Sequence, residues 1–159
     1  MFQVEMYTGT KQENYQLLLK HLQALIEDEH NQTANLANAA ALLNQFLKEV
    51  NWVGFYLVEN EELVLGPFQG LPACVRIPFG KGVCGTAAQN QQIERVGDVN
   101  QFPGHIACDA ASRSEIVIPI IKNGKLIGVL DIDSPNTDRF DDQDEMFLKK
   151  FVEILVLNL

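Results

Sequence analysis

The fold of this chain is decided by residues 115–133, which read EIVIPIIKNGKLIGVLDID. Two runs rich in β-branched residues, 115–121 and 126–133, flank the dipeptide Asn123-Gly124. An Asn-Gly pair between two such runs strongly indicates a β-hairpin, because both residues tolerate the positive φ that the two-residue turn requires. The stretch therefore predicts two antiparallel strands joined by a tight turn.

Upstream of this hairpin the chain has further strand-like runs. Runs at 52–58 and 63–68, joined by a polar turn, predict a second antiparallel pair. Shorter strands are expected at 75–77 and 93–96, with a brief helix through 87–89 between them. The middle of the chain is therefore expected to form an antiparallel sheet.

Helices are expected at both ends of the chain. A capping-box sequence at Thr10 opens a run of apolar residues at helical spacing over about 11–28, and a second apolar stripe ends before Asn51. The acidic run at 141–144 opens a last amphipathic helix. Together these patterns indicate an α+β fold, an antiparallel sheet with helices on at least one face, in one domain spanning 1–159.

The composition excludes several classes of protein. The chain has 47% apolar and 21% charged residues, as globular domains do, and no apolar run approaches the length that spans a bilayer. Its formal net charge of −9 would repel phosphate backbones, so nucleic acid is not expected as a partner. The N-terminal residues lack the features of a signal peptide, which favours the reducing cytoplasm, where cysteines rest as thiols.

Three cysteines, Cys74, Cys84 and Cys108, are candidates for chemistry. None belongs to a CxxC pair, so we expect no metal site and no cofactor. Cys84 lies near the start of the brief helix, where unpaired N–H groups favour a thiolate. Cys108 lies in the long polar loop 98–113, beside Asp109, where exposure to solvent or ligand is expected. The alternative for any one of them is a small buried hydrophobe.

The loop that contains Cys84, residues 80–85, reads GKGVCG and matches the dinucleotide-binding pattern GxGxxG. That pattern binds a nucleotide only within a parallel βαβ unit with an acidic residue about 20 positions later, and neither feature is evident here. We interpret the loop as a turn that needs the positive φ of glycine.

Two carboxylates, Asp131 and Asp133, are spaced at the strand period and so share one face of the second hairpin strand with Ile127 and Val129. Buried like charges are costly, so one of the two is expected to be held as the neutral acid. The alternative is a strand end that frays into solvent.

Glu115 completes an acidic triplet only if the hairpin register is irregular. A regular two-residue loop pairs residue 116 with 131, which turns Glu115 to the opposite face from Asp131. Pro119 cannot donate to the ladder, and a bulge near it would restore the parity. We therefore predict such an irregularity; a regular ladder would count against Glu115 as a site residue.

Trp52 and Tyr56 are four residues apart on a strand and therefore share a face, with Gly54 between them. The glycine would leave room for a ligand above it, and the two rings would wall a pocket suited to a thioether or methyl group. The alternative is that both rings belong to the core.

From about residue 15 to the end, the chain resembles a known family. Runs at 114–120, 128–134 and 140–142 resemble a GAF domain. More narrowly, the chain resembles the free methionine-(R)-sulfoxide reductases in the segments Asn51–Tyr56, Gly66–Gly70, Gly82–Gly85 and His105–Asp109. Generic GAF sensors share the strand patterns without the thiols.

The resemblance implies a six-stranded antiparallel sheet flanked by N-terminal and C-terminal helices, a homodimer, and reduction of the R epimer of free methionine sulfoxide with thioredoxin as reductant. It implies Cys108 as nucleophile, Cys74 as resolving thiol and Cys84 as an additional site thiol. It also implies a substrate pocket that contains Trp52, Tyr56, Glu115, Asp131 and Asp133. The alternative function is a GAF module that senses a small molecule or dimerises without turnover.

The chemistry of these residue types fits a thiol-based redox enzyme. Sulfoxide reduction needs a thiolate to attack sulfur and an acid to protonate the departing oxygen, and a crowded carboxyl with a raised pKa is such an acid. The remaining carboxylates can hold the substrate ammonium. Attack would leave a sulfenic acid that a second thiol converts to a disulfide, which an external dithiol reopens. Which of Glu115, Asp131 and Asp133 is the acid stays open.

Overall fold

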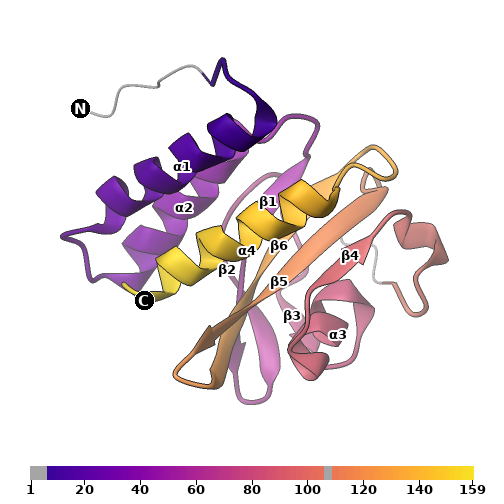
Figure 1. The fold of residues 1–159 in the computed structure, drawn as a ribbon. Coiled ribbons are helices and arrows are strands. Elements are labelled where there is room, and N and C mark those ends of the chain that lie inside the picture. The colour runs from indigo at the N-terminus through magenta and orange to yellow at the C-terminus, as the bar shows by residue number, and fades with distance from the viewer. Residues whose placement is uncertain (1–6, 106–108) are drawn as a thin grey trace.

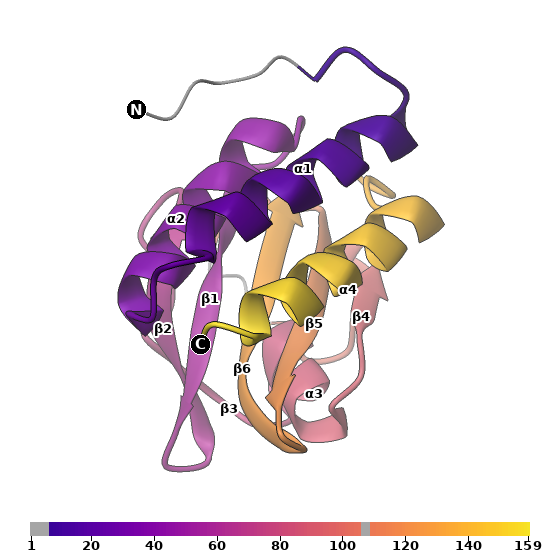
Figure 2. The same ribbon diagram turned by 60° about the vertical axis from the view of Figure 1, so that its left-hand side comes forward.

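Helices cover both faces of one antiparallel sheet. The computed structural model describes residues 7–105 and 109–159 of the chain. Its helices are α1 (Lys11–Ile26), α2 (Gln32–Phe46), α3 (Gly82–Asn90) and α4 (Asp142–Val156). Figures 1 and 2 show α1, α2 and α4 together on one face of the sheet and α3 on the other. Among the described residues, no helix combines the length and the apolar character that a membrane crossing needs.

The described residues form six strands in the order β3-β2-β1-β6-β5-β4, and each neighbouring pair is antiparallel. The strands are β1 (Trp52–Glu59), β2 (Glu62–Gln69), β3 (Arg76–Pro78), β4 (Glu94–Val96), β5 (Ser114–Lys122) and β6 (Lys125–Ser134). A 3-10 turn, η1 (Val99–Gln101), follows β4. The predicted α+β architecture is confirmed, and the pairing of β1 with β6 brings the two stretches that carry candidate site residues side by side.

The two faces of the sheet carry separate apolar cores. On one face, helix residues such as Leu22 pack against fully buried strand residues such as Phe55 and Ile132. On the other face, α3 packs Ala87 into a second cluster that includes Val129. The described candidate site residues gather at this second face, beneath the shortest of the four α-helices.

The hairpin of β5 and β6 contains the predicted irregularity. Ile120 lies opposite Gly128 and Ile121 lies opposite Leu126, so Ile127 is one extra residue on β6. One extra residue reverses the face that every later side chain takes relative to the facing strand. The irregularity lies just past the proline near which we expected it, and its extra residue is on the facing strand.

The bulge places three acidic side chains on one face of the sheet. Glu115 lies directly opposite Asp133, two residues along β6 from Asp131. The prediction that Ile127 shares this face is wrong, because the bulge falls at this residue. Ile127 packs with the larger helical core, whereas Val129 lies in the core beneath α3.

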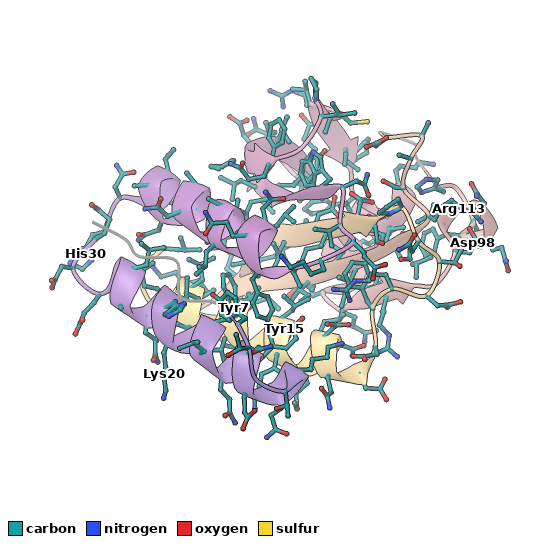
Figure 3. The ribbon with its side chains drawn as sticks, turned by 90° about the horizontal axis from the view of Figure 1, so that it is seen from above. Tyr7, Tyr15, Lys20, His30, Asp98 and Arg113 are labelled. Atoms are coloured by element: carbon teal, nitrogen blue, oxygen red, sulfur yellow. The ribbon has the colours of Figure 1, made fainter. Side chains whose placement is uncertain are left out.

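A buried polar contact fastens α1 to α4. Tyr15 is labelled in Figure 3. Its Oη donates a hydrogen bond of 2.6 Å to Asp144 Oδ1, and its ring stacks on Phe147 with centroids 4.9 Å apart. Asp144 is fully buried, and its Oδ2 accepts from Lys11 Nζ at 2.9 Å and from Arg139 at 3.2 Å. The carboxylate is therefore paired on both oxygens.

Replacing Asp144 with alanine is expected to lower the free energy of unfolding by about 3–5 kcal/mol. The change leaves the buried Tyr15 hydroxyl without its acceptor, removes the ion pairs with Lys11 and Arg139, and removes half of the α4 capping box. Urea denaturation measures the change. The control is Asp142→Asn in the same turn, since this side chain is 95% exposed in its ion pair with Arg95, and a change below about 1 kcal/mol is expected. Equal losses in the two variants would contradict the prediction.

Candidate active site

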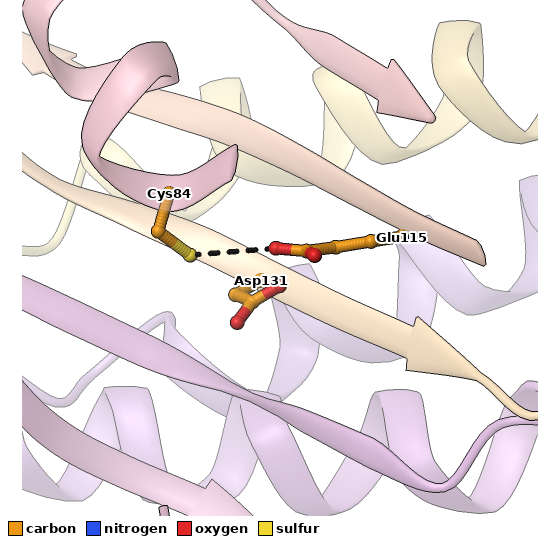
Figure 4. Close-up of side chains that lie close together, drawn as sticks. All are labelled: Cys84, Glu115 and Asp131. Atoms are coloured by element: carbon orange, nitrogen blue, oxygen red, sulfur yellow. Dashed lines mark hydrogen bonds between the residues drawn. The ribbon is translucent and has the colours of Figure 1, made fainter. Parts of the chain in front are cut away.

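Three acidic side chains and one thiol meet beneath α3. Glu115 of β5 and Asp131 of β6 are each 6% exposed, and Asp133 near the end of β6 is half-buried. Cys84 lies in the first turn of α3, and its Sγ donates a weak hydrogen bond to Glu115 Oε1 at 3.7 Å (Figure 4). Two neighbouring strands and one helix terminus thus concentrate four titratable groups in one place.

Burial and mutual repulsion favour the neutral form of these carboxyls. Burial raises the pKa of Glu115 and Asp133 well above the usual range, and the charge of Asp131 raises it further. Burial also raises the pKa of Asp131, to about 6, while hydrogen bonds from Cys84 and Glu115 limit the rise. Asp131 is therefore the first of the three to ionise as the pH rises. The expectation that crowding leaves a neutral carboxylic acid here is confirmed.

The prediction that the helix terminus favours a Cys84 thiolate is wrong. Burial raises the pKa of this thiol well above its usual value, and the charges of Asp131, Glu115 and Asp133 raise it further. The partial positive charge at the start of a nine-residue helix acts in the opposite direction, but burial beside three carboxyls outweighs it. Cys84 is therefore a free, protonated thiol that acts as a hydrogen-bond donor.

Aromatic side chains wall one side of this cluster. The Trp52 ring stacks on Tyr56, with centroids 5.8 Å apart, and on Phe68, with centroids 5.2 Å apart. Trp52 Nε1 donates to the Leu71 carbonyl at 3.1 Å, and Tyr56 Oη donates to the Cys74 carbonyl at 3.0 Å. Ring packing and these hydrogen bonds together fix the orientation of the wall.

The space above Gly54 is filled, contrary to the prediction that it leaves room for a ligand. A Cβ atom on this glycine would lie 2.3 Å from Phe68 Cβ and 2.6 Å from Trp52 Cη2. The glycine therefore allows the indole to lie close over the backbone. Trp52 lines the pocket, whereas Gly54 does not.

The cluster and the aromatic wall border one pocket. Its lining includes six residues that the sequence singled out, namely Trp52, Tyr56, Cys84, Glu115, Asp131 and Asp133. Cys74 is not among the lining residues; it is disulfide-bonded, and its carbonyl accepts the hydrogen bond from the Tyr56 hydroxyl. Cys108 lies outside the described residues.

The lining also contains residues that were not predicted as site residues: Lys81, His105, Asp109 and Ser112. Asn51, just before β1, connects two of them, because its Nδ2 donates to Asp109 Oδ2 at 2.9 Å and to Ser112 Oγ at 3.1 Å. Its main-chain N–H donates to the Asp133 carbonyl at 2.9 Å. Asn51 therefore joins the end of the long loop to the end of β6. The only sequence signal for it was its place in a family-like motif.

Two buried polar atoms at the pocket have no hydrogen-bond partner among the described residues: Asp131 Oδ1 and His105 Nδ1. Burial lowers the pKa of His105, so its imidazole is neutral near pH 7. Buried polar groups in native proteins are nearly always paired, so unpaired ones at a pocket indicate where the polar groups of a ligand bind.

Backbone geometry requires glycines in and next to the turn before α3. Gly80 and Gly82 have φ of 78° and 62°, and a Cβ on Gly85 would lie 2.4 Å from the Pro78 oxygen. The strands before and after the helix, β3 and β4, pair with antiparallel neighbours, so these residues do not form the parallel unit of a dinucleotide site. The interpretation of this loop as a glycine turn is confirmed.

Comparison with known proteins agrees with this fold. The GAF domain model matches residues 22–159. The chain is 54% identical over 142 residues to the free methionine-R-sulfoxide reductase of Escherichia coli, an alignment that covers 89% of this chain and 86% of that protein. The reduced form of fRMsr from Staphylococcus aureus matches with a TM-score of 0.90 at 57% identity, over 98% of this chain and 99% of that one. The free methionine-R-sulfoxide reductase of Neisseria meningitidis, in complex with its substrate, gives 0.95 at 44% identity, over 99% and 95%.

The sheet order and the family match define a GAF-domain protein. Similarity to these relatives over nearly their whole length narrows this class to one family. The chain belongs to the free methionine-R-sulfoxide reductase family. The resemblance drawn from the sequence motifs is confirmed.

Proposed function

We propose that this chain reduces the R epimer of free methionine sulfoxide to methionine in a thiol-dependent cycle. The observation that carries the proposal is the buried acidic cluster, with an unpaired Asp131 oxygen, beside an aromatic wall in one pocket. Relatives named as free methionine-R-sulfoxide reductases, one of them solved with its substrate, support the same activity for this chain.

The pocket offers a suitable group to each part of the substrate. Asp131, with a pKa of about 6, is ionised near neutral pH and can accept charge-assisted hydrogen bonds from the substrate ammonium. The Trp52 ring can pack against the methyl group and sulfur. Helix α3 begins without a side-chain cap, and Gly82 and Val83 of its first turn line the pocket, so their N–H groups are available to the substrate carboxylate.

In the proposed cycle Cys108 is the nucleophile and Cys74 the resolving thiol. The Cys108 thiolate attacks the sulfoxide sulfur while a protonated carboxyl, Glu115 or Asp133, gives its proton to the sulfoxide oxygen. In the net reaction the oxygen passes to Cys108, which becomes a sulfenic acid, and methionine leaves. Cys74 condenses with the sulfenic acid, water leaves, and a thioredoxin dithiol reduces the new disulfide. The disulfide at Cys74 and the free thiol of Cys84 support this division of roles.

NADPH oxidation coupled through thioredoxin and thioredoxin reductase tests the function. We expect turnover of the separated R epimer of free methionine sulfoxide and none of the S epimer. A matched control is N-acetylmethionine (R)-sulfoxide, which lacks the ammonium for Asp131, and its turnover is expected to fall by roughly 100-fold or more. Binding of the R epimer without turnover would favour the alternative, a small-molecule sensor. Failure to turn over either epimer would overturn the proposal.

The homodimer and the cytoplasmic location stay predictions from the sequence. Light scattering during size-exclusion chromatography measures the mass in solution and tests the first of them. A mass of one chain would contradict the homodimer.

Replacing Asn51 with alanine is expected to raise KM about tenfold with a smaller change in kcat, because Asp109 and Ser112 lose the amide that holds them at the pocket. A hydrogen bond from Ser112 lowers the pKa of Asp133, so release of this serine should also move that pKa upward in the pH profile. Kinetics over a range of pH measure both effects. Asn100→Ala, an exposed asparagine in η1, is the control and should change neither. An unchanged KM in the Asn51 variant would contradict the positioning role.

A further inference from the structure

Cys84, Glu115 and Asp131 place three metal-binding atoms close together. Cys84 Sγ, one oxygen of Glu115 and one oxygen of Asp131 lie within 4.8 Å of one another, and all three side chains are buried (Figure 4). They project from three different elements, α3, β5 and β6. The described ranges, 7–105 and 109–159, contain no other group of three such atoms.

A second observation indicates that the cluster accepts a cation. Asp131 Oδ1 is shielded from solvent, its residue lines the pocket, and it has no hydrogen-bond partner among the described residues. Across the described part of the chain, no ion pair reaches Glu115, Asp131 or Asp133. Two buried carboxyls and a half-buried one, with no ion pair to a cation among the described residues, favour an external positive charge.

The spacing of the donors fits a tetrahedral zinc ion. Zinc–sulfur bonds of roughly 2.3 Å and zinc–oxygen bonds of roughly 2.0 Å hold sulfur and oxygen about 3.5 Å apart at the tetrahedral angle. The distance from Cys84 Sγ to Glu115 Oε1 is 3.7 Å. Magnesium and calcium prefer six or more oxygen ligands, so a thiol among few carboxylates disfavours them.

We propose that Cys84, Glu115 and Asp131 bind one zinc ion in the place of the substrate ammonium, so that zinc inhibits this protein reversibly. The thiol and any protonated carboxyl release their protons to solvent as the ion binds, and no group changes oxidation state. A fourth position is open to water. The inhibition rests on the proposed function, whereas the metal site rests on the geometry alone.

Cobalt(II), which takes the same tetrahedral ligands and absorbs light, tests the site without catalysis. Protein reduced with a phosphine and desalted under nitrogen should bind one equivalent and show a thiolate-to-cobalt charge-transfer band. The band is expected to persist in the double variant Cys74→Ser/Cys108→Ser, in which Cys84 is the single thiol, and to disappear in Cys84→Ser. A band that disappears in the double variant and persists in Cys84→Ser, or the lack of a band in every variant, overturns the proposal.

The carboxylate ligand is tested by Asp131→Asn, which is expected to weaken cobalt binding by roughly tenfold or more. Asp142→Asn, an exposed carboxylate on α4, is the matched control and should leave the affinity unchanged. Equal affinities in the two variants would overturn the assignment of Asp131 as a ligand.

Inhibition is measured as methionine released from the R sulfoxide by the reduced protein in one turnover, with no thioredoxin present to bind zinc. Zinc is expected to lower this release, excess substrate to oppose it, and EDTA to restore it. Unchanged release at a zinc concentration that saturates the site would overturn the inhibition. Protein that binds cobalt through Cys84 yet releases no methionine even without zinc would support the metal site and contradict the proposed function.

Discussion

The Cys108→Ser variant is expected to release no measurable methionine from the R sulfoxide, even in a single turnover of fully reduced protein. A serine hydroxyl is not ionised near neutral pH and attacks sulfur far more weakly than a thiolate, so the rate should fall by roughly a thousandfold or more. The measurement mixes reduced protein in excess with substrate, quenches the mixture in acid and quantifies methionine by chromatography. Without thioredoxin, the assay reports the first chemical step alone.

The Cys74→Ser variant makes the same chemical change at the second proposed thiol. It is expected to release one equivalent of methionine and then stop, because the sulfenic acid has no resolving partner. The pocket should persist in this variant, since the Tyr56 hydroxyl donates to the main-chain carbonyl of Cys74, which the substitution keeps. The reverse pattern, with the first turnover lost in Cys74→Ser and kept in Cys108→Ser, would exchange the two roles.

Local sequence rules predict part, but not all, of the position of the acidic cluster. The Asn123-Gly124 turn predicts the hairpin, and the strand period puts Asp131 and Asp133 on one face. The need for a bulge to bring Glu115 to that face also follows from counting residues. The place of the bulge does not, because packing between strand and helices decides which residue is extruded, and Ile127 packs into the core on the opposite face.

Two of the wrong predictions, the Cys84 thiolate and the open space above Gly54, concern contacts between distant parts of the chain. Cys84 lies in the first turn of a helix, as expected, but the charge state of its thiol depends on three carboxyls from β5 and β6. Gly54 shares a face with Trp52, as expected, but no local pattern predicts that the indole lies over the glycine. Local patterns place such residues on elements, and only tertiary packing sets their surroundings.

The sequence patterns did not identify Asn51 and Ser112 as site residues. Polar residues at the ends of loops are common and follow no period, so no local rule separates a residue that organises a pocket from one that faces water. Here the distinguishing fact is a set of hydrogen bonds between residues about 60 positions apart in the chain. Family-like motifs around Trp52 came closest to marking this neighbourhood.

The Asp131→Asn variant is expected to be more stable than the parent protein at neutral pH and nearly inactive. The pKa of Asp131 is about 6 in the folded protein against 3.8 for an unperturbed aspartate, so between these pH values the folded state holds a proton that the unfolded state has released. Stability therefore falls as the pH rises through this window, and above it the charged form costs the fold about 1–3 kcal/mol. Asparagine keeps the shape without the charge and removes this cost.

The pH dependence of the free energy of unfolding distinguishes loss of the Asp131 charge from other effects of the substitution. Urea denaturation at pH 7.5 should show the gain, whereas at pH 4 the gain should nearly vanish, because the folded parent is then protonated at Asp131. The charge of Asp131 also raises the pKa of Glu115 and Asp133, so both should titrate at lower pH in the variant. Glu153→Gln, an exposed carboxylate on α4, is the control, and its change should stay within about 0.5 kcal/mol at either pH.

Activity should move in the direction opposite to stability. Without the Asp131 charge, the substrate ammonium loses a buried partner, and kcat/KM for the R sulfoxide is expected to fall by roughly 100-fold or more. A variant that loses both stability and activity would mean that Asp131 supports the fold rather than a ligand. A gain in stability together with a loss in activity is expected if the folded protein is destabilised by the charge on this carboxylate, and if that charge binds a cation that none of the described residues supplies.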